Sequence, residues 1–449
     1  MILKNKKWSC LLPFLSLGLL LFPSSTFAAK PITQLESQPV PARPKNIIIM
    51  IGDGMGPAYT TAYRYYQDNP DTENIEHTVF DRLLVGMSST HPTKSEGIVT
   101  DSAAAATALS SGIKTYNGAI GINKHKQAVR SIMQLAKQQG MSTGIAVTSQ
   151  VNHATPAAFL SHNESRRNYD EIALSYLHTD TDVILGGGQQ YFSSELIEQF
   201  KNKGYQYITD VSELNSLKQA KVLGLFADKE LPWAINEKKA HKLSRETQTA
   251  LTLLSNNPKG FVLLVEGSLI DWAGHSNDIV SAMGEMNEFA NAVEVAEQFV
   301  RQHPETLLVI TADHNTGGLS IGANDVYAWN SALIRGVQSS PDNIAIAALE
   351  SHDWQDIVSK QLGFKLNEAE INQLAAAKKE NQDIFTDEIN KIISRRSHTG
   401  WTSHGHTGVD VQVFATGPSS ALFHGHQDNT DIANNMISLL PTNQNNPNP

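Results

Sequence analysis

The sequence predicts an α/β fold, a three-layer αβα sandwich with helices on both faces of a central, mostly parallel sheet. Two patterns predict it. Short uninterrupted apolar runs of strand length recur along the chain, as expected of strands that are buried on both faces. Segments with helical periodicity lie between these runs, and strands alternating with helices build parallel sheets. With 449 residues, 40% hydrophobic and 18% charged, the chain can form one large domain with a sizeable core.

The N-terminal segment has the three parts of an export signal. A lysine-rich start precedes an apolar run from Leu11 to Phe22, and small residues lead to an expected cleavage site after Ala28. The apolar run is too short to span a bilayer comfortably, and the rest of the sequence holds no run of spanning length. We therefore expect residues 1–28 to be a signal peptide. The mature protein is expected to be periplasmic or secreted, without membrane contact.

The charge and the cysteine content exclude some classes of partner. The formal net charge is −10, and loss of the three signal lysines would make it about −13. This charge argues against nucleic acid and anionic membranes as general partners. The single cysteine, Cys10, lies in the signal, so the mature chain would form no disulfide. Its stability must then come from its core, from metals or from oligomerisation.

The rest of the chain divides into a linker, one large domain and a tail. Residues 29–45, rich in Pro, Ser and Gln, are expected to be the linker, and residues 46–440 the large domain. Residues from about 320 to 400 are polar and interrupt the alternation of strands and helices, so we expect an insertion on the sheet, with a lid or a dimer element as its candidate roles. Residues 441–449 are expected to be disordered.

The expected elements follow from the apolar runs and from helical periodicity. The predicted strands are 46–51, 142–148, 182–185, 260–265, 306–311 and 411–415. The predicted helices include 128–139, 167–177, 243–254 and 282–302, with 368–380 and 387–395 inside the insertion.

Side chains that can bind metals follow four of the predicted strands. In open α/β sheets, ligands bind beyond the carboxyl ends of the strands, so these side chains are candidates for one site. Carboxylates and imidazoles without thiolates suit Zn²⁺ where histidines gather and Mg²⁺ where only oxygens gather. Two metals about 4 Å apart form a recurring clamp for displacement at phosphorus. The candidates are Asp53, His153, Thr155, Glu266, Asp271, His275, Asp313 and His314.

Each of these segments also has a simpler interpretation. The GDG at 52–54 resembles the start of a dinucleotide-binding loop, although an acid inside that loop disfavours it. Asp271 and His275 are spaced i, i+4 and share one helical face, as an exposed pair would. Directly after a buried strand, however, this spacing favours a metal site. The neighbours Asp313 and His314 would point to opposite faces of a regular strand, so they can converge only where the strand ends.

Asp101 and Ser102 stand at the start of an alanine-rich segment, AAAATAL, that is predicted to be helical. Both residue types are preferred at helix N-caps, and this segment alone favours a cap. A helix N-terminus also attracts anions, and a serine coordinated to Zn²⁺ can ionise and attack. The metal-like clusters elsewhere in the chain favour Ser102 as a nucleophile.

Taken together, the motifs resemble those of the alkaline phosphatase family, exported metal-dependent phosphomonoesterases of the αβα-sandwich class. They occur in the family's order and cover the chain from about residue 46 to 435. The matching motifs are GDGMG (52–56), VTDSAAAATAL (99–109), SGIKTYNGAIG (111–121), HATPAA (153–158), SR (165–166), EGSLIDWAGH (266–275), TADHNTGG (311–318), GHTG (405–408) and NTDIA (429–433).

The resemblance implies a centre with two Zn²⁺ ions and one Mg²⁺ ion, at which Ser102 forms a phosphoseryl intermediate. It implies that Arg166 clamps the phosphate, since a planar guanidinium suits two phosphate oxygens at once. Asp101 would position Arg166. The implied ligand sets are Asp271, His275 and His406 for one zinc, Asp53, Asp313 and His314 for the other, and Asp53, Thr155 and Glu266 for magnesium.

Several positions depend on the resemblance alone. By spacing, His398, His404 and His406 are equal candidates, and only the H-T-G match selects His406. His153 and Trp272 occupy positions that vary within the family, and both are expected to affect phosphate release and the pH optimum. The resemblance further implies a homodimer that acts on phosphate monoesters and releases inorganic phosphate.

Two other functions stay open at this point. Another enzyme of the same superfamily, a phosphodiesterase, phosphomutase or sulfatase, could use a similar centre. Sulfatases usually need a modified Cys or Ser in a different motif. An exported phosphate- or metal-binding protein without turnover is the second alternative, and the presence of both Ser102 and Arg166 argues against it.

Overall fold

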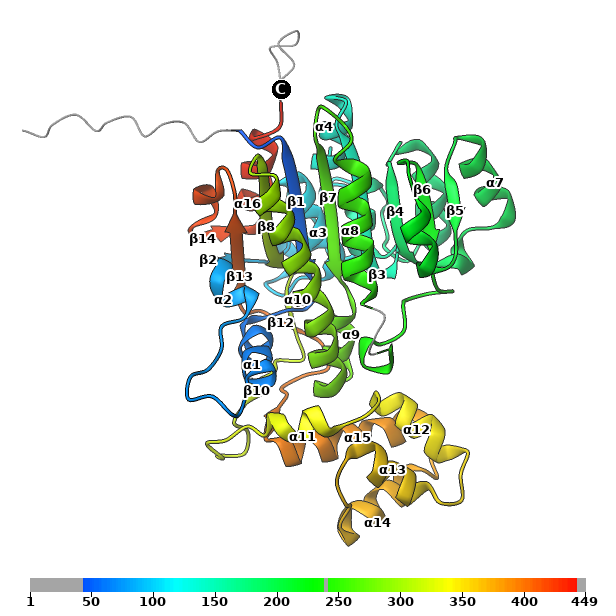
Figure 1. The fold of residues 1–449 in the computed structure, drawn as a ribbon, viewed down its shortest axis with the longest axis vertical. Coiled ribbons are helices and arrows are strands. Elements are labelled where there is room, and N and C mark those ends of the chain that lie inside the picture. The colour runs from blue at the N-terminus through cyan, green and yellow to red at the C-terminus, as the bar shows by residue number, and fades with distance from the viewer. Residues whose placement is uncertain (1–42, 238–240, 442–449) are drawn as a thin grey trace, which may run out of the picture. The chain divides into compact units, whose positions relative to one another are not determined.

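The computed structural model describes residues 43–237 and 241–441 (Figure 1). The predicted signal peptide, residues 1–28, lies outside the described residues, as do most of the predicted linker and positions 442–449 of the predicted tail. Within the described part of the chain, no helix is both long and apolar enough to cross a bilayer.

A ten-stranded sheet forms the centre of the structure, and all of its strands except β13 run in the same direction. β13 is antiparallel to both of its neighbours, β8 and β2. The prediction of a mostly parallel sheet is therefore confirmed. In spatial order the strands are β14 (Gly425–Asp428), β2 (Leu84–Ser89), β13 (Val411–Thr416), β8 (Thr306–Ala312), β1 (Asn46–Gly52), β7 (Phe261–Gly267), β3 (Ser142–Gln150), β4 (Val183–Gly187), β6 (Val222–Leu225) and β5 (Gln206–Ile208).

The central strands are apolar on both faces because both faces are covered. Along β1, Ile48 and Met50 belong to the core on one side of the sheet. Ile47, Ile49 and Ile51 belong to the core on the other side, as the two-residue repeat of a strand requires. This is why β1 appears in the sequence as an unbroken apolar run rather than an alternating one.

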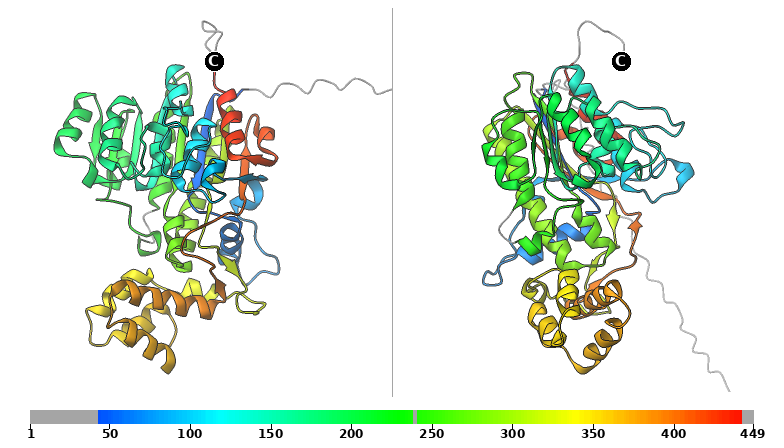
Figure 2. Two further views of the ribbon diagram at one scale, coloured as in Figure 1. Left: turned by 180° about the vertical axis from the view of Figure 1, so that it is seen from behind. Right: turned by 90° about the vertical axis from the view of Figure 1, so that its right-hand side faces the viewer.

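Helices cover both faces of the sheet, which confirms the predicted three-layer sandwich (Figures 1 and 2). One layer contains α1 (Pro57–Gln67), α2 (Val79–Leu83), α8 (Lys242–Leu254), α9 (Leu269–His275) and α10 (Ile279–Gln302). The other contains α3 (Ser102–Ser111), α4 (Ile132–Gln138), α5 (Ala154–Leu160), α6 (Tyr169–Ser175), α7 (Ser194–Asn202) and α16 (Asn429–Ser438).

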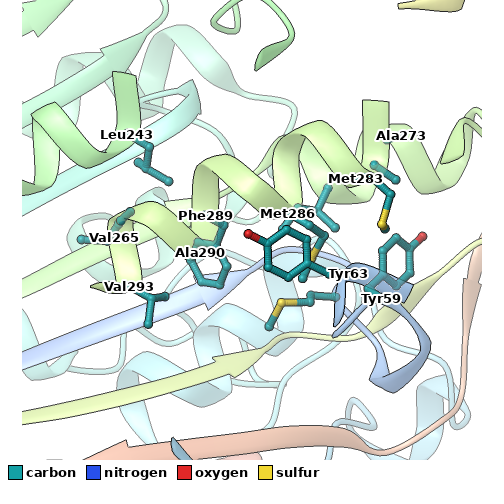
Figure 3. Packing of buried hydrophobic residues seen from close by; sticks show 14 of the residues in the cluster. Tyr59, Tyr63, Leu243, Val265, Ala273, Met283, Met286, Phe289, Ala290 and Val293 are labelled. Carbon is teal, nitrogen blue, oxygen red and sulfur yellow. The ribbon is translucent and has the colours of Figure 1, made fainter. Parts of the chain in front are cut away.

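The longest of the described helices, α10, packs its apolar side against α1 and the sheet. Figure 3 shows Met283, Met286 and Phe289 of α10 beside Tyr59 and Tyr63 of α1. All five side chains are buried. Burial of an aromatic or methionine side chain contributes about 1.5–3 kcal/mol, so this contact anchors α1, which follows β1 directly.

Four strands of the sheet were not predicted from the sequence. The missed strands are β2, β5, β6 and β14. β2 is mostly half-exposed, and β14 has the sequence GHQD without an apolar side chain. Strands toward the edge of a sheet need not be apolar on both faces, so β2 and β14 carry no continuous apolar run. β6, by contrast, is fully buried, and its apolar run VLGL is short and interrupted by Gly224.

Residues 320–400 form a group of helices held between two short paired strands, β10 (Ser320–Ile321) and β11 (Thr399–Gly400). Because β10 and β11 pair with each other, the segment leaves and rejoins the sandwich at one place. Its helices share buried apolar side chains, among them Ile344 and Phe385. The helices are α11 (Ser331–Gly336), α12 (Pro341–Leu349), α13 (Trp354–Leu362), α14 (Glu368–Ala377) and α15 (Gln382–Ser397).

A buried carboxyl between α8 and α10 makes the sandwich sensitive to pH. Glu246 is fully buried, and neither of its side-chain oxygens has a hydrogen-bond partner among the described residues. Burial raises the pKa of Glu246 well above its usual value, Glu288 raises it further, and Lys242 and Arg245 oppose them. The unfolded chain loses this proton near pH 4.3, about the usual value, whereas the folded chain keeps it. Stability therefore falls as pH rises above that point.

We expect Glu246→Met to raise the free energy of unfolding at pH 8 by about 1–4 kcal/mol, because an apolar side chain of similar volume removes the desolvation penalty. The gain should be smaller at pH 5. Urea denaturation at both pH values measures it, with Glu294→Met, at an exposed site on α10, as the control. A gain that does not grow between pH 5 and pH 8 would contradict the interpretation.

Candidate active site

The four strands that precede the predicted metal ligands are neighbours in the sheet, in the order β8, β1, β7, β3. They are parallel, so their carboxyl ends lie at the same edge. Gly52 at the end of β1 is in register with Gly267 of β7 and Ala312 of β8. Asp53 and Asp313, each one residue further along, therefore leave the sheet at the same level.

Gly54 allows the chain to turn tightly between these ligands. Its φ of 70° is left-handed, and a Cβ atom here would lie 2.8 Å from the Cα of Asp271. Its N–H donates a 3.0 Å hydrogen bond to Oδ1 of Asp313. A side chain at Gly54 would therefore be strained and would push apart the segments of Gly54 and Asp271, which carry candidate ligands.

The first cluster of candidate ligands consists of Asp53, Asp313 and His314, all fully or almost fully buried. Nε2 of His314 lies 3.2 Å from Oδ2 of Asp313 and 3.5 Å from Oδ1 of Asp53. Burial raises the pKa of Asp313 to about 8, and burial together with Asp313 raises the pKa of Asp53. Oγ of Ser102 lies 3.1 Å from the same Nε2, so the serine faces this cluster directly.

The second cluster joins Asp271 and His275 of α9 to His406 of β12 (His406–Thr407). Nε2 of His275 lies 3.3 Å from Oδ2 of Asp271 and 3.2 Å from Nε2 of His406. Burial would raise the pKa of Asp271, but the hydrogen bond from His275 and the nearby imidazoles hold it below the usual range. The ring of His314 stacks on His406 with centroids 3.6 Å apart, so the two clusters are contiguous.

The protonation of two imidazoles follows from their outer partners. Nδ1 of His406 lies 2.8 Å from the carbonyl oxygen of Thr100. Nδ1 of His275 contacts the carbonyl oxygen of His404. A carbonyl oxygen only accepts, so each Nδ1 carries the proton and donates it. With Nδ1 as the donor to a carbonyl, each ring keeps its Nε2 directed at the cluster and free to bind a metal in place of a proton.

The third cluster contains Asp53, Glu266 and His153, with Thr155 buried at the start of α5. Burial raises the pKa of Glu266 to about 7. Burial lowers the pKa of His153 to about 3, assisted by Arg166, so this imidazole is neutral. An Arg166 N–H donates to Nε2 of His153 at 3.2 Å. His153 thus lies between the third cluster and the arginine.

Buried carboxylate oxygens without partners show that these clusters fit cations. Both oxygens of Asp53 and Oε1 of Glu266 accept no hydrogen bond from the described residues. An unpaired buried carboxylate is costly, and several such groups within reach of one another raise each other's pKa. Divalent cations would neutralise them, and the donor set of carboxylates and imidazoles without thiolates suits Zn²⁺ and Mg²⁺.

At the start of α3, Asp101 and Ser102 have different roles: Asp101 caps the helix, and Ser102 is left free of capping. Asp101 is the N-cap, and its Oδ1 accepts a 2.9 Å hydrogen bond from the N–H of Ala104. Its Oδ2 accepts from Nη1 of Arg166 at 3.1 Å. Ser102 is therefore not needed as a cap, and its hydroxyl turns toward His314. The small side chains of α3 are all buried, which allows the helix to approach the clusters closely.

The two variable positions contact each other next to the arginine. The ring of Trp272, on α9, packs edge-on against His153 with centroids 5.8 Å apart. Neither group carries charge, since the imidazole of His153 is neutral.

The sequence is similar to that of known alkaline phosphatases over almost all of the described chain. A family model described as alkaline phosphatase matches residues 44–442. The chain belongs to the alkaline phosphatase family. Alkaline phosphatase 3 of Bacillus subtilis (strain 168) is 45% identical over 413 residues, 89% of each chain, and alkaline phosphatase 4 of the same strain is 42% identical over 450 residues, 97% of each. Membership makes the chain a phosphomonoester hydrolase.

Solved structures of alkaline phosphatases have the same fold. A cold-active alkaline phosphatase from the psychrophile Shewanella sp. is 62% identical with a TM-score of 0.88, covering 88% of this chain and 100% of that one. The Thermus thermophilus alkaline phosphatase is 25% identical with a TM-score of 0.80, over 89% and 93% of the chains. A mutant alkaline phosphatase of the Antarctic bacterium TAB5, solved with Mg bound in its M3 site, is 28% identical with a TM-score of 0.67, over 90% and 99%.

Of the three histidines that spacing left equal, His406 is the one whose ring enters a cluster. His404 contacts His275 through its carbonyl oxygen, and its own Nδ1 lies 2.9 Å from the carbonyl oxygen of His275. His398 is the C-cap of α15, with a left-handed φ of 58°.

Thr316 was missed from the sequence. It is buried on β9 (Asn315–Thr316), its hydroxyl donates to Oδ1 of Asp271, and its Oγ1 lies 3.3 Å from Nδ1 of His314. It therefore connects His314 of the first cluster to Asp271 of the second. The motif TADHNTGG contains Thr316, but a hydroxyl without charge gives no sign of this contact in the sequence.

Proposed function

We propose that the chain hydrolyses phosphate monoesters through a phosphoserine intermediate on Ser102, at a centre that holds two Zn²⁺ ions and one Mg²⁺ ion. Family membership supports the hydrolysis, and the intermediate and the metal composition are the proposed part. The observation that carries the proposal is the position of Oγ of Ser102, 3.1 Å from Nε2 of His314, where α3 meets the first cluster.

Three donor sets would hold the metals. We assign zinc to the two sets with imidazoles and magnesium to the set dominated by oxygens. The magnesium bound to the TAB5 mutant supports a magnesium-binding centre in the family. When bound, the metals supply positive charge that stabilises the ionised serine, the phosphoryl group and the leaving oxygen. The proposed sets are Asp271, His275 and His406; Asp53, Asp313 and His314; and Asp53, Thr155 and Glu266.

The protein's own groups provide the nucleophile and bind the phosphate. Oγ of Ser102 attacks phosphorus, the bond from phosphorus to the ester oxygen breaks, and the alcohol leaves. Water then breaks the bond between Oγ and phosphorus, which restores Ser102 and releases inorganic phosphate. Two in-line displacements retain configuration at phosphorus. The free N–H groups and the dipole of α3 favour the anionic group at Ser102.

Arg166 is assigned to the phosphate oxygens. Asp101 and His153 each accept one of its N–H groups, which fixes the orientation of the guanidinium and leaves other donors for the substrate. His153 contacts Arg166 and Trp272 packs against His153, so we infer that both residues affect phosphate binding and release without adding charge.

Trapping the intermediate tests the proposal. When the metal-loaded enzyme is mixed with an aryl phosphate and quenched in acid within one turnover, mass spectrometry should find one phosphoryl group on the peptide that contains α3. Fragmentation should place it on Ser102 rather than on Ser110 or Ser111 of the same helix. Hydrolysis with no phosphorylated serine, or with the phosphoryl group on another residue, would overturn the assignment.

We further propose that the chain is exported and forms a homodimer. The signal-like composition of residues 1–28 supports export to the periplasm or the medium. N-terminal sequencing of the exported protein should begin at Ala29, and a start at Met1 would exclude cleavage.

The homodimer is tested by light scattering. It should give twice the mass of the mature chain, whereas the mass of one chain would exclude the dimer.

A further inference from the structure

We propose that Asn117 is a positioning residue that sets the place of Ser102 relative to Arg166. Neither the sequence motifs nor the ligand clusters assign it a role. The inference rests on the proposed functions of Ser102 as nucleophile and Arg166 as phosphate clamp.

Asn117 holds both ends of the segment before the nucleophile. Its Oδ1 accepts a 3.0 Å hydrogen bond from the N–H of Asp101, and its Nδ2 donates at 3.3 Å to the carbonyl oxygen of Val99. Between them, the carbonyl oxygen of Thr100 accepts from Nδ1 of His406 at 2.8 Å. Three consecutive residues before Ser102 are thus held from outside the segment, and Asn117 supplies two of these contacts.

The same turn also holds the segment that carries the arginine. The carbonyl oxygen of Gly118 accepts a 2.8 Å hydrogen bond from the N–H of Arg166. The hydroxyl of Tyr116 donates to the carbonyl oxygen of Glu164 at 3.1 Å. Residues 116–118 therefore contact the segment of the nucleophile through the side chain of Asn117. They contact the segment of the arginine through the carbonyl oxygen of Gly118 and the side chain of Tyr116.

These contacts form a closed ring. Asn117 holds Asp101, Asp101 holds the guanidinium of Arg166, and the main chain of Arg166 returns to Gly118 beside Asn117. Removal of the Asn117 side chain opens the ring at one point and leaves Arg166 attached to Gly118. The arginine then keeps its place while Asp101 and Ser102 lose theirs. Small errors in the relative position of reacting groups are costly to the rate, up to about 100-fold for 1 Å.

The exposure of Asn117 separates this role from a structural one. Its side chain lies at the surface, where substitutions usually leave stability almost unchanged. Asn123, in the next turn, provides a matched control, because its Oδ1 accepts from the N–H groups of His125 and Gln127 and contacts neither active-site segment.

The experiment uses the full metal-loaded enzyme with p-nitrophenyl phosphate. Asn117→Ala should lower kcat/KM by about 10-fold and raise the inhibition constant of inorganic phosphate, with metal content and melting temperature unchanged. Asn117→Asp, which can still accept from Asp101 but cannot donate to Val99, should recover part of the loss. Asn123→Ala should behave as wild type. Equal losses in Asn117→Ala and Asn123→Ala, or loss of metal, would overturn the proposal.

A double-mutant cycle that combines Asn117→Ala with Arg166→Ala distinguishes a positioning role of Asn117 from a purely structural one. Without the guanidinium, Asn117 has no group to align with Ser102. In the Arg166→Ala background, Asn117→Ala should therefore lower kcat/KM by less than about 3-fold. Full additivity of the two losses would overturn the proposal. If Ser102→Ala keeps wild-type activity, the proposed function itself fails. If Ser102→Ala is inactive while Asn117→Ala has wild-type kcat/KM and phosphate inhibition, only the role of Asn117 fails.

Discussion

Ser102→Ala is expected to lower kcat/KM for an aryl phosphate by about 1,000-fold or more. The hydroxyl of Ser102 faces Nε2 of His314 at 3.1 Å, and α3 holds it at the edge of the first cluster. Without that oxygen the covalent route is closed, and only slower direct attack by water on the bound ester is left. The fold should survive, because Asp101 rather than Ser102 caps α3.

The control for this variant is Ser111→Ala, at the far end of α3, where the hydroxyl donates to the carbonyl oxygen of Thr107. It should keep wild-type turnover. Equal metal content in both variants would show that the loss belongs to the nucleophile. Turnover near wild type in Ser102→Ala would refute the nucleophile assignment.

The interior of the sheet could be predicted from the sequence because burial on both faces leaves a continuous apolar run. β1 and β7 follow this rule, whereas β14, which is polar and partly exposed, does not. The carboxyl-end rule then selected the segments that carry the candidate ligands, since Asp53 and Asp313 come directly after such runs. The buried strands could be predicted because the hydrophobic effect requires apolar side chains at buried positions, and a short stretch of sequence is enough to show them.

The assembly of the site could not be predicted in the same way. The order β8, β1, β7, β3 depends on pairing between strands far apart in the chain, and no local pattern encodes it. For the same reason, spacing could not choose between His404 and His406, because the choice depends on which ring lies beside Asp271. The side chains of Asn117 and Thr316 carry no charge, so neither composition nor charge in the sequence indicates their hydrogen bonds.

Removal of divalent metals is expected to abolish activity, with a loss of at least about 100-fold after treatment with EDTA. Zn²⁺ and Mg²⁺ together should restore it, and metal analysis of the active enzyme should give two zinc ions and one magnesium ion per chain. Mg²⁺ alone should not restore it, because imidazole-rich sets favour zinc. An unchanged rate after complete removal of metals would refute the metal centre.

Metal removal should also change how stability depends on pH. Without metal, burial raises the pKa of Asp313 to about 8 and that of Glu266 to about 7, so the folded chain binds protons that the unfolded chain releases near pH 4. The stability of the metal-free protein should therefore fall between about pH 4 and pH 8. Metal ions replace these protons, and their binding to the folded chain adds stability. The difference in melting temperature between metal-loaded and metal-free protein should then be larger at pH 8 than at pH 6. A constant difference across this range would show that the clustered carboxylates are not what the metals neutralise.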